Sequence, residues 1–188
     1  MAFLTGARSL AAGAGIAVAL ACDASASSAG QRGGAAEADI KAAFLFNFTK
    51  FVEWPDGAPA GPFQICTLAD ARFDSALAQT LSGESTGGRP IVRATPDGPE
   101  SASGCHILFI ARSETSQIER WLAAVGRHPV LVVGESKAAE DAGAHITFVV
   151  EDNRVKFDVN DDAASRAGLK ISSKLLRVAR RVTARATQ

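Results

Sequence analysis

Apolar and polar residues follow two periods along the chain, and these periods predict its helices and strands. In residues 36–54 the apolar residues recur on one helical face, within about 80°, namely Ile40, Phe44, Phe48 and Phe51, with Leu45 and Val52 beside them. Residues 106–111 (HILFIA) and 130–134 (VLVVG) are continuously apolar, as strands are in a sheet covered on both faces. Further strands are predicted at 63–68, 90–93, 145–150 and 155–159, and further helices at 73–81 and 113–125.

The order of these elements indicates the fold class. Strands and helices alternate through most of the chain, and Asp152-Asn153 suits a tight hairpin turn between the last two strands. Asp161 and Asp162, which follow Asn160, are typical of a further helix start. The sequence therefore predicts one layered α/β domain over residues 36–186, with a mostly parallel sheet, an antiparallel hairpin at one edge and flanking helices.

The first 26 residues have the order of a secretory signal peptide. Arg8 and the amino terminus are positive, residues 10–21 are uncharged and small or apolar, and Ala-Ser-Ala at 24–26 resembles a cleavage site. Twelve such residues are too few to span a bilayer. Residues 19–22 (ALAC) also resemble a lipoprotein cleavage box, so lipid attachment at Cys22 is the alternative. Residues 27–35 are Gly-rich and polar, and they predict a flexible tether.

The C-terminal segment predicts a helix that begins at Ser172 or Ser173 and is amphipathic. Its apolar side holds Leu175, Val178, Ala179 and Val182, and its basic side holds Lys174, Arg177, Arg181 and Arg185. A basic stripe of this kind is typical of a solvated helix face. The alternative is contact with an acidic partner or with anionic lipid headgroups.

Cys66 and Cys105 are the two cysteines that remain after removal of a signal peptide. In an oxidising compartment two thiols usually form a disulfide. The bond would close a loop of about 40 residues and stabilise the fold by about 4 kcal/mol. A metal site is the competing interpretation, although neither cysteine has a Cys-x-x-Cys spacing.

Charge and motifs exclude several classes of function. The 20 Lys and Arg residues balance the 20 Asp and Glu residues, which argues against nucleic-acid binding. The three histidines, His106, His128 and His145, have no metal-ligand spacing. The chain has no Gly-x-Ser-x-Gly motif and no phosphate-binding loop. We therefore predict no catalytic residue, no metal and no cofactor, and we keep a motif-free hydrolase only as a third alternative.

Two places remain as candidate binding sites. Asp70 and Gly134 each lie at the carboxyl end of a predicted strand, where α/β folds bind small ligands, although Asp70 is also a typical helix cap. Phe46 points away from the predicted core face of the first helix, beside Lys50. Either another part of the chain covers Phe46, or Phe46 and Trp54 form a protein-binding surface.

Several segments together resemble the YfiR family of periplasmic regulatory proteins. They are residues 41–55 (KAAFLFNFTKFVEWP), FQICTL around Cys66, CHILFI at 105–110, residues 143–148 with 155–160, and residues 163–176. The resemblance covers residues 37–180. Phe46 stands where the family often has Tyr, and the second cysteine pair of some members is absent, which leaves their redox sensing in doubt here.

This resemblance implies a non-enzymatic regulator in the periplasm. The best-known relatives repress a membrane-bound diguanylate cyclase through its periplasmic part, lowering cyclic di-GMP, and are sequestered by an outer-membrane lipoprotein. The family also implies the Cys66–Cys105 disulfide. We therefore expect regulation by protein–protein contact, with Phe46, Trp54, Arg177 and Arg181 as candidate contact residues and a homodimer as one possible assembly. A periplasmic small-ligand-binding module is the alternative.

Overall fold

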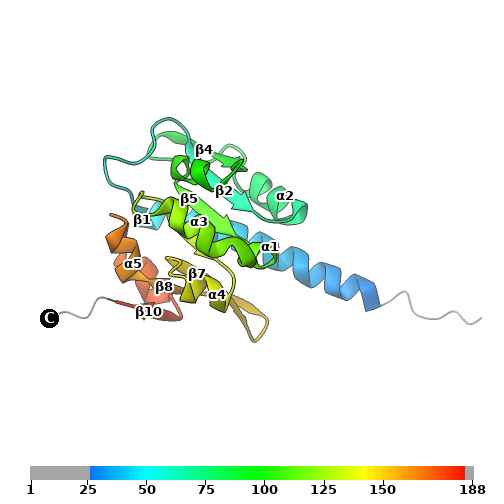
Figure 1. Cartoon of the computed structure of the whole chain (residues 1–188). Helices are drawn as coiled ribbons and strands as arrows, with labels where there is room; N and C mark the ends of the chain where they lie inside the picture. Colours follow the sequence, from blue (N-terminus) through cyan, green and yellow to red (C-terminus); the bar gives the residue numbers. More distant parts are fainter. Residues whose placement is uncertain (1–25, 185–188) are drawn as a thin grey trace, which may run out of the picture.

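A central sheet separates two layers of helices in a computed structural model that describes the backbone of residues 26–184 and the side chains of residues 34–184 (Figure 1). The eight strands run in the order β10-β8-β7-β6-β5-β2-β4-β3. Their bounds are β2 (Phe63–Leu68), β3 (Ser85–Thr86), β4 (Arg89–Ala94), β5 (Ile107–Ile110), β6 (Leu131–Gly134), β7 (Ile146–Glu151), β8 (Arg154–Asn160) and β10 (Arg181–Thr183). A separate antiparallel ribbon joins β1 (Val52–Glu53) to β9 (Lys170–Ile171).

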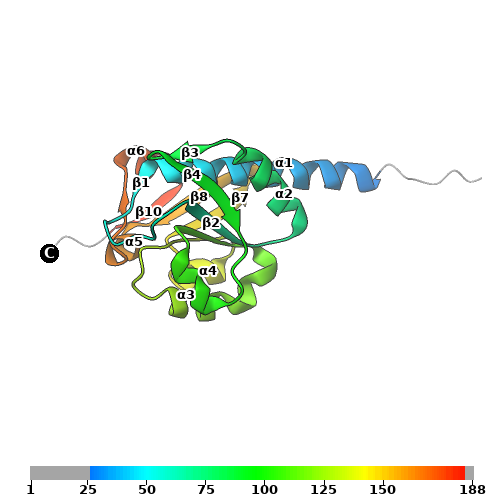
Figure 2. The ribbon, with the colours of Figure 1, turned by 90° about the horizontal axis from the view of Figure 1, so that it is seen from above.

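Helices cover both faces of the sheet, as the view from above shows (Figure 2). One face carries α1 (Ala26–Phe51) and α2 (Ala71–Thr80), and the other carries α3 (Ile118–Val125) and α4 (Lys137–Asp141). The shorter elements are η1 (Pro99–Gly104), η2 (Arg112–Gln117), α5 (Asp161–Arg166) and α6 (Ser173–Val178). Side chains of β5 alternate between two buried cores, with Phe109 in the α1 core and Leu108 in the α3 core. This alternation explains the continuously apolar strand sequences.

The predicted fold class is confirmed. Strands β7, β6, β5, β2 and β4 pair in parallel, and β7 and β8 form the expected antiparallel hairpin. Asp152 and Asn153 take φ angles of 51° and 58°, the left-handed conformation that a tight hairpin turn requires. Asp70 accepts the backbone N–H of Phe73 and caps its helix as expected. The next helix begins at Asp161 as expected, and Asn160 caps it by accepting the N–H of Ala163.

The topology contains one change of direction that matters for the site. From β2 the chain passes through α2 to β4 on one side, and it then crosses to β5 on the other side of β2. The carboxyl ends of β2 and β5 therefore flank a topological switch point, the place where open α/β sheets bind ligands.

The core face of α1 differs from the predicted one. Leu45, Phe48 and Val52 are buried, but Ile40 is 44% exposed, so its assignment to the core was wrong. Phe44 and Phe51 are half-buried at the edge of the contact with the sheet. The helix is apolar around much of its circumference, with small residues at Ala42 and Ala43, and periodicity alone does not fix its rotation.

The prediction of a flexible tether at residues 27–35 was also wrong. Residues 27–35 belong to α1, which begins at Ala26. Each residue added to a helix that has already formed contributes a backbone hydrogen bond, and this gain outweighs the low helix propensity of the glycines. The predicted signal peptide, apart from the residue at 26, and Cys22 lie outside the described residues.

The predicted long C-terminal helix is replaced by a short helix and a strand. Helix α6 ends at Val178, the Arg180 N–H donates to the Phe157 carbonyl oxygen at 2.8 Å, and β10 then pairs in parallel with β8. This pairing satisfies backbone groups along β8, which explains why the helix does not continue. The hairpin is consequently one strand in from the sheet edge, and Arg185 lies beyond the described residues.

Candidate functional site

A cavity of about 290 Å³ lies at the carboxyl ends of β2, β5 and β6. Its walls come from the residues that follow these strands and from α1 and α2: Gly34, Glu37, Ala38, Lys41, Ala69, Asp70, Arg72, Phe73, Phe109, Ala111, Arg112, Ser113 and Glu135. We call it the carboxyl-end cavity. It occupies the topological switch point, and α1 crosses over it.

A buried ion cluster joins α1 to the end of β6 at this cavity. The Lys41 side chain is 8% exposed, and its Nζ lies 2.8 Å from Oε1 of Glu135, which is 10% exposed. Lys41 also pairs with Glu37, one turn earlier on α1. The second oxygen of Glu135 accepts the backbone N–H of Arg112 at 3.0 Å. Each buried charge therefore has a partner, as burial in a protein requires.

Two arginines at the cavity remain available for other contacts. Arg72 and Arg112 line it and are exposed, and neither forms an ion pair with any side chain among residues 34–184. Asp70, by contrast, uses one carboxylate oxygen to accept the N–H of Phe73. The acidic groups of the cavity are thus held by internal bonds, whereas the two guanidinium groups are not.

Asp70 and Gly134, the two residues that the sequence suggested for a ligand, have different surroundings. Asp70 lines the cavity, while Gly134 is not among its lining residues. A Cβ at Gly134 would overlap Cβ of Ala139, so this glycine permits close packing of α4 on the sheet. Close packing therefore explains the glycine at position 134 without a bound ligand.

A second concave surface lies between α1, β8 and α6. This groove, about 380 Å³, is lined by Phe44, Val155, Lys156, Phe157, Val178 and Arg180, and we call it the α1–α6 groove. Val178 is 68% exposed, although the sequence placed it on a buried helix side. Val178 is the last residue of α6, and this explains its exposure, because no following helical turn covers it.

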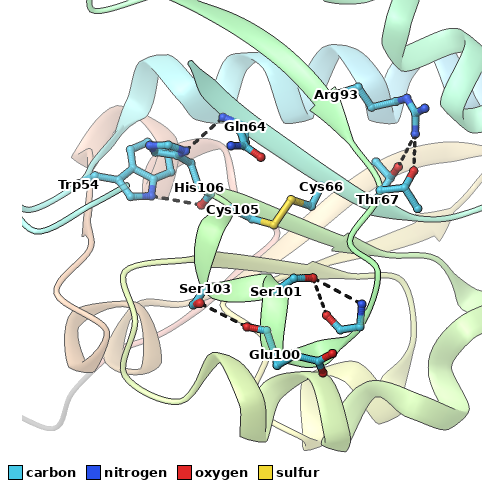
Figure 3. Close-up of a disulfide and its surroundings, with 12 residues drawn as sticks. Trp54, Gln64, Cys66, Thr67, Arg93, Glu100, Ser101, Ser103, Cys105 and His106 are labelled. Atoms are coloured by element: carbon cyan, nitrogen blue, oxygen red, sulfur yellow. Dashed lines mark hydrogen bonds between the residues drawn. A yellow bond between two sulfur atoms is a disulfide. The ribbon is translucent and has the colours of Figure 1, made fainter. Parts of the chain in front are cut away.

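The disulfide lies in the α3 core and joins the middle of β2 to the residues before β5 (Figure 3). Cys66 of β2 is bonded to Cys105, which directly precedes His106 and β5, with a Cα–Cα distance of 5.9 Å. The predicted pairing is therefore present in the structure. Cys105 follows η1, so the bond fixes this short helix beside the parallel pair β2–β5.

The two strand-initial histidines make the same kind of bond. Nδ1 of His106 accepts the N–H of Gln64 at 3.1 Å, and Nδ1 of His145 accepts the N–H of Val132 at 3.0 Å. Burial lowers the pKa of both, and for His145 the value falls to about 4. Nearby arginines, Arg89 for His106 and Arg166 for His145, lower it further. These are neutral structural histidines.

The aromatic contact candidates on and after α1 are partly covered. Trp54 donates its indole N–H to the His106 carbonyl oxygen at 3.1 Å (Figure 3). Its ring packs edge-on against that of Phe63, with the ring centres 4.9 Å apart. Phe46 is half-buried, and Nζ of Lys50 lies 3.9 Å from its ring centre. Both side chains are partly covered by the chain itself, and their role as contact residues stays a prediction.

The basic candidates lie on different elements. Arg177 is exposed on α6, whereas Arg181 belongs to β10 and pairs with Glu140 and Asp158. Arg180, unnoticed in the sequence, donates to Asp158 at 2.8 Å. This bond lowers the pKa of the Asp158 carboxyl, and the charges of both arginines lower it further. The predicted basic stripe on one helix is therefore wrong.

The residues that sequence reasoning missed are Lys41, Arg72, Arg112 and Glu135. Arg112 and Glu135 each come just after an apolar strand, and this position was the available signal. Across the described residues, no group of three or more His, Cys, Asp or Glu side chains gathers as metal ligands. In the same part of the chain, every helix is too short or too polar to cross a bilayer.

Comparison with solved structures supports the fold. A conserved domain protein from Vibrio cholerae O1 biovar eltor is similar with a TM-score of 0.56 and 12% identity, over 78% of this chain and 60% of that one. This chain thus spans about 60% of that relative's length. An ABC domain from Streptococcus pneumonia in complex with L-Trp gives a TM-score of 0.48 and 9% identity, over 64% and 55% of the two chains, too low to support an inference.

Residues 38–180 match the YfiR/HmsC-like family. The match covers most of the chain and contains the disulfide, the Lys41–Glu135 pair and the α1–α6 groove. The disulfide agrees with an exported protein, because such bonds persist in oxidising compartments. The chain belongs to the YfiR/HmsC-like family of periplasmic regulatory proteins.

Proposed function

We propose that this protein is a non-enzymatic regulator that binds the periplasmic part of a membrane-bound sensor, with a diguanylate cyclase as the expected target. In this proposal the bound regulator represses the cyclase and lowers cyclic di-GMP. An outer-membrane lipoprotein would relieve the repression by sequestering the regulator. Family membership supports the regulatory role, and the distribution of exposed apolar residues supports the contact surface.

The observation that carries the contact surface is the clustering of exposed apolar side chains at the α1–α6 groove. Of the five large hydrophobic residues that are exposed in the described part, Val178 lines the groove, and Ile40 and Val150 lie next to lining residues. Ile40 lies one turn before Phe44, and Val150 is the cross-strand partner of Val155. An apolar surface of this kind marks a site of protein contact.

The charges at the rim indicate the chemistry of the partner. Lys156 and Arg180 line the groove, and Arg177 is adjacent to Val178 in the chain. Lys156 and Arg180 both pair with Glu151, whereas Arg177 has no ion-pair partner among the side chains of residues 34–184. The surface therefore suits an apolar segment with an acidic residue near it, and Arg177 is the basic contact retained from the sequence.

Replacing Val178 tests this surface. A strain lacking the gene is complemented with the wild type, with Val178→Asp or with Val92→Asp, and cellular cyclic di-GMP is quantified by mass spectrometry. Val92 is a matched control, because it is 37% exposed but lies on β4, away from the groove. Both substitutions are at exposed positions and should leave folding nearly unchanged.

We expect cyclic di-GMP to rise in the deletion strain and to return to its normal level with the wild type and with Val92→Asp. Val178→Asp should fail to restore it while reaching the same protein level. Full complementation by Val178→Asp would contradict the groove as the contact surface. Unchanged cyclic di-GMP in the deletion strain would contradict a cyclase as the target.

A further inference from the structure

The carboxyl-end cavity combines an apolar floor with charged walls. Phe109 and Phe73 stack with ring centres 4.3 Å apart, and Ala69 and Ala111 complete the apolar surface. Its volume of about 290 Å³ is close to the lower end of small-molecule pockets. A ligand that fills it would therefore be small and would have one apolar portion.

The cavity has equal numbers of positive and negative side chains, but they differ in whether they already have partners within the protein. Its three carboxylates are Glu37, Asp70 and Glu135, and its three cations are Lys41, Arg72 and Arg112. Lys41 forms ion pairs with both Glu37 and Glu135, and Asp70 caps α2 through one carboxylate oxygen. What remains for a ligand is a pair of guanidinium groups, and guanidinium groups bind carboxylate and phosphate through paired N–H donors.

The arrangement of the backbone keeps these arginines at the cavity. Arg72 belongs to the first turn of α2 and reaches α1, where a Cβ at Gly34 would lie 3.1 Å from its Nη1. Arg112 begins η2, and its own N–H is fixed by Glu135. The two arginines thus approach from the ends of β2 and β5, on either side of the topological switch point.

We propose that the carboxyl-end cavity binds a small organic anion, with its carboxylate or phosphate group on Arg72 and Arg112 and its apolar part on Ala69 and Ala111. The buried Lys41–Glu135 pair forms part of the charged wall of the site. This binding site lies apart from the α1–α6 groove, and it does not depend on whether the protein contacts a cyclase.

The proposal is tested with phenyl phosphate, which has an anionic group and one apolar ring. The disulfide-bonded exported protein is titrated while its backbone amide signals are followed by NMR. We expect the largest shifts at residues 110–113 and 135, with weaker binding of inorganic phosphate and none of phenol. A parallel titration with benzoate shows whether a carboxylate replaces the phosphate.

Two double variants show whether binding depends on the cavity arginines. Arg72→Gln with Arg112→Gln should weaken binding of phenyl phosphate by about tenfold or more, because hydrogen bonds to charged groups are lost. Arg120→Gln with Arg127→Gln removes two exposed arginines of the α3 region and should leave binding unchanged. Absence of binding by both phenyl phosphate and benzoate, or equal weakening by both double variants, would overturn the proposal. Because no partner protein is present, failure here leaves the regulatory proposal intact.

Discussion

The polar side chains at the two ends of the central sheet differ in how many of them are paired within the protein. At the amino end, His106 and His145 each accept a backbone N–H from the neighbouring strand, and Trp54 donates to the His106 carbonyl oxygen. At the carboxyl end, Lys41 and Glu135 are paired, but a cavity remains between α1 and the strands. Arg72 and Arg112 stand at that cavity without an ion-pair partner among the described side chains.

This difference separates residues that hold the fold from residues that are free to bind. A buried polar group that is fully paired contributes to stability and has no capacity for another ligand. Exposed guanidinium groups contribute little to stability and keep their donors available. The comparison therefore predicts that changes at the amino end affect unfolding, whereas changes of the cavity arginines affect binding.

The largest expected effect is at the disulfide, which joins β2 to the residues before the amino end of β5. Replacing Cys66 and Cys105 together by Ala removes the constraint on a loop with a sequence separation of 39. The free energy of unfolding should fall by about 4 kcal/mol, chiefly because the unfolded chain gains freedom. Urea unfolding of the variant and of the reduced wild type measures this loss. A stability equal to that of the oxidised wild type would contradict the role given to the bond.

The next effect is a loss of stability at low pH that originates at His145. Its pKa is about 4 in the folded protein and 6.5 in the unfolded chain. Between these values the unfolded chain binds the extra proton, so the free energy of unfolding decreases as pH falls from 6.5 towards 4. The full loss is about 3 kcal/mol.

Urea unfolding at a series of pH values measures this loss. His145→Gln should reduce the dependence on pH, because the titrating group is gone. His128→Gln, at an exposed position, is the control and should retain the wild-type dependence. An equal dependence in His145→Gln and the wild type would assign the loss to other groups.

A smaller effect is expected for Trp54→Phe. The substitution keeps an aromatic ring against Phe63 and removes the hydrogen bond to the His106 carbonyl oxygen. That oxygen still accepts the N–H of Leu131 at 2.8 Å, so it is not left without a partner. We expect a loss of about 1 kcal/mol in the free energy of unfolding. A loss as large as that of the disulfide variant would show that the indole has a greater structural role.

The smallest effect on stability is expected at the cavity mouth. Arg72→Gln and Arg112→Gln, singly or together, should change the free energy of unfolding by less than about 0.5 kcal/mol, because both side chains are exposed and form no ion pair with described residues. Differential scanning calorimetry gives the comparison with the wild type. A clear fall in melting temperature would mean that these arginines are structural, which would remove the contrast between the two ends.

Local features of the fold were predictable from the sequence because short segments determine them. Asp70 and Asn160 cap helices, and Asp152-Asn153 forms a hairpin turn, through contacts within a few residues. The continuous apolar runs of β5 and β6 reveal that both faces of the sheet are covered. The cysteine pairing followed from the small number of cysteines.

Features that depend on distant partners were not predictable in the same way. Lys41 looks like an interruption of an apolar helix until Glu135 is placed beside it. Residues 181–183 carry a helical pattern, but the free edge of β8 provides backbone partners that favour a strand. The rotation of α1 that exposes Ile40 is likewise set by packing on the sheet. The groove and the cavity both arise from such long-range contacts.

The most direct test measures stability and binding on the same pair of variants. The free energy of unfolding and the dissociation constant for phenyl phosphate are determined for Trp54→Phe and for the Arg72→Gln, Arg112→Gln double variant. The account predicts a crossed result, in which Trp54→Phe loses stability and keeps its affinity, while the double variant keeps its stability and loses affinity about tenfold. If both properties fall together in either variant, the two ends of the sheet do not have separate roles.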